Sequence, residues 1–213
     1  MRIDEIVRYW RGGQAQDPAG RWVHQLNRET FDAHSHDFDL HHPVSPYVGD
    51  ALNAPVVILG SNAGYNPKTT PMEFPDAKAL DACLAGVDDP TSADWTTDAP
   101  YYHRTNYGRF IAEGNAVLVN ACAYRSRRLG EEPNNLRMLK QLPSVTLTRR
   151  WLLEAVLPLA RLGDRLIVVK RSRAWALPKT FREANGVYVD PAPRSPLVTG
   201  PALKAMTAFL RER

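Results

Sequence analysis

Pro55-Val-Val-Ile-Leu-Gly60 is a nearly continuous apolar run that ends in a glycine. Such a run is typical of a central parallel strand that is covered on both faces. Similar runs follow at 116–120 (Ala-Val-Leu-Val-Asn), 165–169 (Arg-Leu-Ile-Val-Val) and 186–189 (Gly-Val-Tyr-Val). Because helical segments separate these runs, the sequence predicts an α/β fold. We expect a three-layer α/β/α sandwich with a mostly parallel central sheet of about four strands.

Helices are expected between these strands and at both ends of the chain. The segments with helical periodicity or helix-start signals are 2–10, 76–86, 104–113, 133–142, 147–161 and 202–213. The chain has 213 residues, 44% of them hydrophobic and 23% charged, which is enough apolar material for one core. We therefore expect one domain over 1–213, with residues 1–45 as a helical and loop extension.

The composition argues against several classes of protein. Cys83 and Cys122 lie far apart and form no CxxC pair, so a zinc site or an iron–sulfur cluster is not expected. The charged N-terminal segment lacks the apolar centre of a signal peptide, and no apolar stretch approaches membrane-spanning length. We expect a cytoplasmic monomer that uses no cofactor.

The protein carries a small excess of basic residues. The formal net charge is +4 and the pI is about 9.2, which is compatible with DNA as a partner but does not require it. Basic segments follow the second and third predicted strands, and backbone phosphates are their natural partners, although a solvated face has the same composition. The candidate DNA-binding residues in them are Arg125, Arg127, Lys170 and Arg171.

In an open parallel sheet, ligands bind in the crevice beyond the carboxyl ends of the strands. Functional residues are therefore expected at 60–74, 120–125, 170–175 and 190–197. The first of these segments begins Gly60-Ser-Asn-Ala-Gly64, where glycines admit a ligand to the backbone and Asn62 provides a carboxamide. A tight strand-to-loop turn without a ligand is the alternative interpretation.

Two later segments complete the pattern. Asn120 ends the second apolar run, and a carboxamide suits the edge of a nucleobase because it offers both a donor and an acceptor. A structural asparagine is the alternative. Asp190-Pro-Ala-Pro-Arg-Ser-Pro196 is a stiff loop with a charged tip, and a plain surface connection would also explain it.

Together these three segments resemble the uracil-DNA glycosylase superfamily, most closely its single-strand-selective monofunctional and mismatch-specific branches. The family's G-x-N-P-G turn is similar to Gly60-Ser-Asn-Ala-Gly64, with Ala63 in place of proline. The family's strand-ending asparagine corresponds to Asn120. Its H-P-S-P-x-x-P loop is similar to Asp190-Pro-Ala-Pro-Arg-Ser-Pro196, with aspartate for histidine and alanine for serine. The resemblance covers roughly residues 46–210.

The resemblance implies a role for each motif. Asn62 would hold the water that attacks the anomeric carbon, and Asn120 would read the base. Phe74 would stack on the flipped base, a contact worth roughly 1–3 kcal/mol. Arg194 would probe the gap in the stack or bind a phosphate. The remaining residues that would bind substrate or phosphate are Gly60, Ser61, Ala63, Gly64, Tyr65, Pro191 and Ser195.

One departure from the family bears on the chemistry. Its histidine lies beside the oxygen of the leaving base, where Asp190 stands here and would add a like charge unless it were protonated. Loss of such a donor typically costs about 2.7–4 kcal/mol. We therefore expect weak or absent excision of ordinary uracil, with a protonated Asp190, another donor such as His103, or a different leaving base as the remaining possibilities.

A stretch rich in histidine, His34-Ser-His-Asp-Phe-Asp-Leu-His-His42, matches no metal-binding motif. A divalent metal site, a lining of the active site and a solvated loop all remain open for it. No metal is expected. Trp95, Trp151 and Trp175 are interpreted as packing residues.

The expected function is a monofunctional DNA-base glycosylase, since no lysine nucleophile stands in the three motifs and a lyase step is therefore not expected. Two alternatives remain. One is a non-catalytic protein that binds modified or single-stranded DNA, and the other is a hydrolase that acts on free nucleosides.

Overall fold

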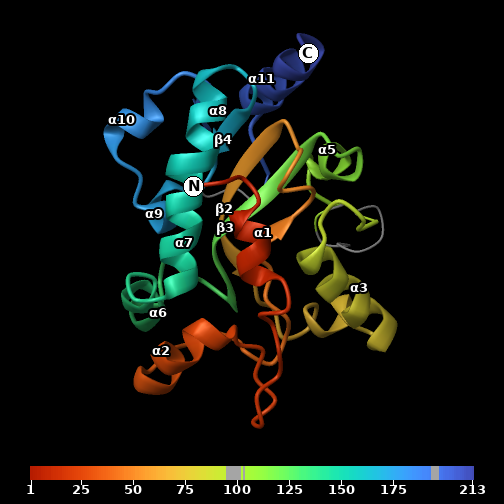
Figure 1. Ribbon diagram of the computed structural model, residues 1–213, viewed down its shortest axis with the longest axis vertical. Helices are drawn as coiled ribbons and strands as arrows, with labels where there is room; N and C mark the ends of the chain where they lie inside the picture. The colour runs from red at the N-terminus through yellow and green to blue at the C-terminus, as the bar shows by residue number, and fades with distance from the viewer. Residues whose placement is uncertain (95–101, 103, 193–196) are drawn as a thin grey trace.

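The computed structural model describes residues 1–94, 102, 104–192 and 197–213. Within these residues five strands form one sheet in the order β1-β3-β2-β4-β5 (Figure 1). The strands are β1 (Tyr47–Val48), β2 (Val56–Gly64), β3 (Ala116–Ser126), β4 (Leu166–Val169) and β5 (Val187–Val189). All neighbours pair in parallel except β1, which pairs antiparallel with β3. The expected α/β class is confirmed; β1 was not predicted because two residues carry no strand pattern.

The helices cover both faces of this sheet. They are α1 (Glu5–Trp10), η1 (Gln25–Asn27), α2 (Arg28–Ala33), η2 (Pro71–Glu73), α3 (Ala77–Asp88), α5 (Gly108–Ala112), α6 (Pro133–Met138), α7 (Pro143–Trp151), the π-helical turn η3 (Leu152–Val156), α8 (Leu157–Arg161), α9 (Ser172–Trp175), α10 (Lys179–Arg182) and α11 (Gly200–Arg211). Because α7, η3 and α8 are continuous, the helix predicted at 147–161 is confirmed. It begins earlier, at Pro143, a residue that suits the first turn of a helix.

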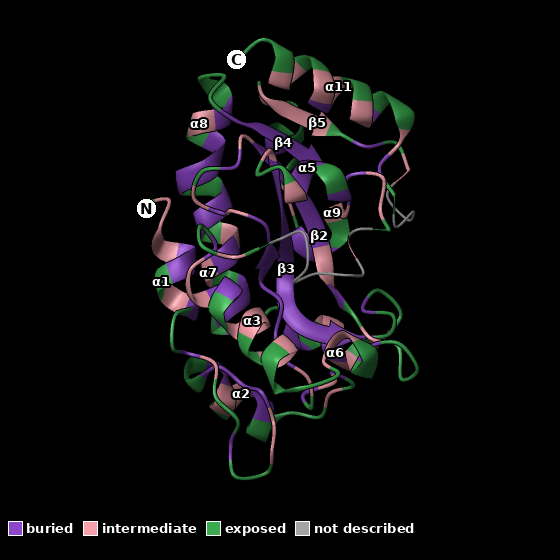
Figure 2. Ribbon diagram, turned by 90° about the vertical axis from the view of Figure 1, so that its right-hand side faces the viewer, coloured by how far each residue is buried: buried purple, intermediate pink, exposed green. Residues whose placement is uncertain are grey.

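Successive side chains of β2 point to opposite faces of the sheet, so the sheet has a separate core on each face. Val57 and Leu59 pack into a core shared with α1, α7 and α8, whereas Val56 and Ile58 face a second core shared with α5 and α11. Figure 2 shows β2, β3 and β4 as buried strands between these helices. The segment 1–45 adds Trp10, Phe31, Phe38 and other apolar side chains to the first core.

The central strands run further than the apolar pattern predicted. Gly60–Gly64 is the last part of β2 rather than a turn, and Asn120 lies in the middle of β3 rather than at its end. The N-terminal segment explains this, because it supplies partners to the far half of β3. The amide of Ser45 donates to Ala123, and the amide of Asp39 donates to Arg125, each over 2.9 Å.

Candidate functional site

A row of polar residues crosses the sheet just beyond its last apolar row. Gly60 pairs with Asn120, and the ladder from Leu59 through Val169 to Val189 places Lys170 and Asp190 one step further along their strands. We call Asn120, Gly60, Lys170 and Asp190 the polar row. Its three side chains are each only 2% exposed. Buried polar groups require hydrogen-bond partners, and each of these three side chains has different neighbours.

Asn120 is held by the loop that precedes β1. Its Nδ2 donates to the carbonyl of Ser45 over 2.8 Å, and its backbone amide donates to Pro46 over 2.9 Å. Its Oδ1 lies against Gly60, where a Cβ would come closer than 3.0 Å. Glycine at position 60 is therefore required by this carboxamide, and the side chain of Asn120 has one fixed orientation.

Asn62 lies two residues further along β2 and is half-buried. Its Nδ2 donates to Ser126 Oγ over 3.0 Å and to the carbonyl of Ala63 over 2.7 Å, while its Oδ1 accepts from the hydroxyl of Ser61 over 3.1 Å. Since a carbonyl oxygen has two lone pairs, Oδ1 retains one acceptor position. This geometry is suited to orienting a water molecule.

Lys170 is the basic member of the polar row and directly follows β4. Its Nζ lies 5.3 Å from the centroid of the Tyr107 ring. Burial and, to a smaller extent, the charge of Arg171 lower the pKa of Lys170 to about 8, while Asp190 opposes the shift. Sequence reasoning assigned Lys170 to a surface that meets phosphates; the structure has it buried instead, because α5 and the segment before it cover that side of β4.

The carboxylate of Asp190 accepts hydrogen bonds from backbone amides at the two ends of the Pro-rich loop. One carboxylate oxygen accepts from the amide of Ala192 and the other from the amide of Thr199, each over 3.0 Å. Asn106 fixes the end of the same loop through two hydrogen bonds with the backbone of Val198, of 2.8 and 3.1 Å. The carboxylate therefore shapes the loop, and Pro191 begins that loop in an exposed position. Arg194 and Ser195 lie outside the described residues.

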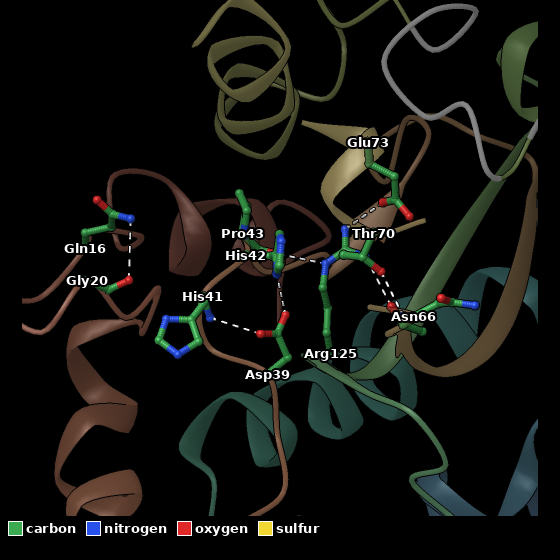
Figure 3. A network of polar contacts seen from close by, with 11 residues as sticks. Gln16, Gly20, Asp39, His41, His42, Pro43, Asn66, Thr70, Glu73 and Arg125 are labelled. Carbon is green, nitrogen blue, oxygen red and sulfur yellow. Dashed lines mark hydrogen bonds and ion pairs between the residues drawn. The ribbon is translucent and has the colours of Figure 1, made fainter. Parts of the chain in front are cut away.

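Arg125 and His42, which are drawn in Figure 3, belong to a second group of side chains that lies near the ring of Phe74. Arg125 lies with its guanidinium carbon 5.3 Å from the centroid of that ring. Its nitrogens donate to the carbonyls of Pro43 and Gly64, each over 3.2 Å, and to Glu73 over 3.0 Å. Because these contacts occupy the guanidinium within the chain, Arg125 is not proposed as a DNA contact.

His42 belongs to this second group and is the last residue of the histidine-rich stretch, for which a lining of the active site was one of the open interpretations. Its Nδ1 lies 2.7 Å from Asp39 Oδ2, and its ring centroid is 5.9 Å from that of Tyr65 and 6.0 Å from that of Phe74. The spacing of Asp39 and His42, three residues apart, was the available signal. Part of the histidine-rich stretch therefore lies beside two of the predicted base-binding residues.

A cavity of about 480 Å³ opens next to this group. Its lining residues are Asp37, Phe38, Asp39, His41, Tyr65, Arg127 and Glu132. The guanidinium of Arg127 lies 5.8 Å from the centroid of the Tyr65 ring. The amide of Tyr65 donates to the carbonyl of Ser126 over 3.0 Å, and Asn62 donates to the hydroxyl of the same serine. Ser126 therefore contacts both Asn62 and a residue that lines the cavity.

The remaining predicted residues occupy varied positions. Ala63 is buried, Ser61, Phe74 and Arg171 are half-buried, and Gly64 is exposed. Trp151 and Trp175 are buried as expected, and Trp175 donates to the carbonyl of Gly60 over 2.6 Å. Trp95 and His103 lie outside the described residues.

Over the described ranges, no three His, Cys, Asp or Glu side chains come together as a metal site. In the same part of the chain, no helix has the length and apolarity to span a membrane. Comparison with known proteins found no matching family model, no matching curated protein and no matching solved structure.

Proposed function

We propose that this chain is a DNA-base glycosylase, which hydrolyses the N-glycosidic bond of a damaged or modified base flipped out of DNA. The observation that carries the proposal is the convergence of Asn62 with the polar row at the carboxyl edge of the sheet. Asn62, Gly60 and Asn120 lie in β2 and β3, Lys170 and Asp190 directly follow β4 and β5, and this edge is where ligands bind in such folds.

The chemistry proposed for this edge begins at Asn62. Its Oδ1 orients a water molecule whose oxygen attacks C1′ as the bond to the base breaks. The bonding electrons leave with the base, the water releases a proton to solvent, and the departing base takes up a proton from solvent. Ser126 supports this role, because its hydroxyl fixes the other end of the carboxamide. Asn120 contributes a carboxamide whose orientation is fixed by its hydrogen bond to the carbonyl of Ser45.

The proposed DNA surface lies around the same edge. Arg127 at the cavity and Arg171 after β4 provide positive charge for phosphates, and the Pro-rich loop at Pro191 approaches the duplex. Phe74, supported by Arg125 and His42, is the proposed stacking partner of the flipped base. The proposed location is the cytoplasm.

A second candidate function is the binding of modified or single-stranded DNA without catalysis. The observation that favours it is Asp190, whose two oxygens already accept backbone amides. In the resembling family, this position holds the histidine next to the leaving base. If no other group replaces that histidine, binding would persist while base release would not.

A panel of single-lesion oligonucleotides separates the candidates. Base release is scored as alkali-labile sites for the wild type, Asn62→Ala and Asn120→Ala, with Asn185→Ala as a matched control, because Asn185 is exposed and precedes β5 at the opposite edge. A glycosylase releases a base from at least one substrate, and both site variants lose this activity while the control keeps it. Tight binding without release from any substrate supports the second candidate. Activity on free nucleosides with salt-independent binding would contradict both.

A further inference from the structure

Lys170 is a buried amine at the edge where the substrate is proposed to bind. Its side chain is 2% exposed, whereas lysine is almost never fully buried unless it is paired. It is the residue after β4, next to Gly60 of β2 on one side and Asp190 of β5 on the other. An amine that is kept at this place against the cost of its desolvation calls for an explanation.

An aromatic ring and two charged groups act on the amine of Lys170. Tyr107 offers the face of its ring to Nζ, and Arg171 and Asp190 are the charged groups that act on it. Both oxygens of Asp190 accept backbone amides of the Pro-rich loop.

These surroundings favour the neutral form of the amine. Burial and the neighbouring guanidinium of Arg171 lower the pKa of Lys170 from 10.5 to about 8, while Asp190 raises it. Desolvation together with an adjacent cation is the arrangement that activates lysines for attack on carbonyl carbons. At pH 8 a surface lysine, with the ordinary pKa of 10.5, would be almost entirely protonated.

We propose that Lys170 forms an imine with the aldehyde of an abasic deoxyribose in DNA, which gives the protein a lyase activity. The inference rests on the proposed function for its substrate, because an abasic site is the product of base removal. It departs from the monofunctional enzyme expected from the sequence motifs, since Lys170 lies outside all three of them.

The reaction needs no co-reactant. The lone pair of Nζ adds to C1′ of the aldehyde, and the carbonyl oxygen takes up two protons and leaves as water. The protonated imine draws electrons from C2′, so that a C2′ proton passes to solvent, a C2′–C3′ double bond forms and the C3′–O bond breaks. The 3′ phosphate leaves with the electron pair of that bond, and hydrolysis of the imine restores the amine.

Reductive trapping tests this directly. An oligonucleotide that already contains an abasic site is incubated with the full chain and sodium cyanoborohydride, and the covalent complex is measured by denaturing gel and mapped by mass spectrometry. The variants are Lys170→Arg and Lys170→Met, with Lys179→Ala as a control because the side chain of Lys179 is 82% exposed on α10. Thermal unfolding verifies that each variant is folded.

Trapping is expected at Lys170, with a loss of roughly 100-fold or more in both Lys170 variants and none in Lys179→Ala. The rate of trapping by the wild type should rise with pH through about 8, as the amine loses its proton. Trapping that persists in folded Lys170 variants, or an absence of trapping by the wild type, would overturn the inference. Because the abasic site is made beforehand, this result does not depend on base release. A protein that traps abasic DNA but releases no base would contradict the proposed function alone.

Discussion

Gly60 and Asn120 face each other across β2 and β3 with no room for a side chain between them. A Cβ at Gly60 would lie within 3.0 Å of Asn120 Oδ1, and the carboxamide cannot turn away without losing its 2.8 Å hydrogen bond to the carbonyl of Ser45. The contact joins the glycine of the first motif to the asparagine of the second. Its contribution to the free energy of unfolding can be measured with a double-mutant cycle.

Gly60→Ala is expected to lower the free energy of unfolding by about 1–3 kcal/mol, because the added methyl group overpacks the contact with Asn120. In an Asn120→Ala background the same change should cost less, since the oxygen it meets is absent. Urea unfolding of the four proteins gives the coupling energy. Gly64→Ala is the matched control, because a Cβ at Gly64 meets nothing within 4 Å. Equal costs in both backgrounds would show that the pair is not coupled.

Asp190→His would restore the histidine of the resembling family, yet we expect it to destabilise the Pro-rich loop. The amides of Ala192 and Thr199 would lose their carboxylate acceptors, and an unpaired buried donor costs about 1–3 kcal/mol. Asp190→Asn should be less harmful, because its remaining carbonyl oxygen serves one of the two amides. Thermal unfolding and base release are measured together. An Asp190→His protein as stable as the wild type would contradict this role of the Asp190 carboxylate.

Lys170→Met should stabilise the protein below pH 8, because it removes a buried cation and keeps an apolar chain of similar length. The pKa of Lys170 is about 8 in the folded chain and 10.5 in the unfolded chain, so the unfolded state binds more protons between these values. Wild-type stability relative to Lys170→Met should therefore rise by roughly 2–3 kcal/mol from pH 8 to 10.5. Denaturant unfolding across this range measures the difference. A difference that does not change with pH would show that Lys170 is solvated.

Arg127 and Arg125 should respond differently to substitution, although they lie two residues apart. Arg127→Ala is expected to weaken DNA binding and to reduce the salt dependence of log Kd by about one ion. Arg125→Lys should leave that slope unchanged, because its guanidinium is occupied by Pro43, Gly64 and Glu73. It should instead cost about 1–3 kcal/mol of stability, since lysine cannot reproduce the three contacts.

Fluorescence anisotropy at several salt concentrations measures the DNA term, and urea unfolding measures the stability term. A reduced salt slope for Arg125→Lys would place its guanidinium at the phosphates and would contradict its internal role.

Local patterns were sufficient to predict most elements of the fold. The apolar runs at 55–60 and 165–169 became β2 and β4, since strands that are buried on both faces must be apolar at every position. The same rule underestimated β3, whose far half reads Ala-Cys-Ala-Tyr-Arg-Ser. That half is extended because the segment around Asp39 and Ser45 pairs with it, and this contact joins residues about 80 positions apart.

The sequence by itself determined the class of fold, the sheet edge at which polar residues gather and the motifs that supply them. Hydrophobic periodicity is a local property of the chain, and the residues that follow parallel strands share one edge of the sheet. Only the tertiary structure decided what each polar side chain does there. It buried Lys170 beneath Tyr107, committed Asp190 to the amides of its own loop and brought His42 beside Phe74. Burial, pKa and hydrogen bonding depend on neighbours in space, and those neighbours come from segments that lie far apart along the chain.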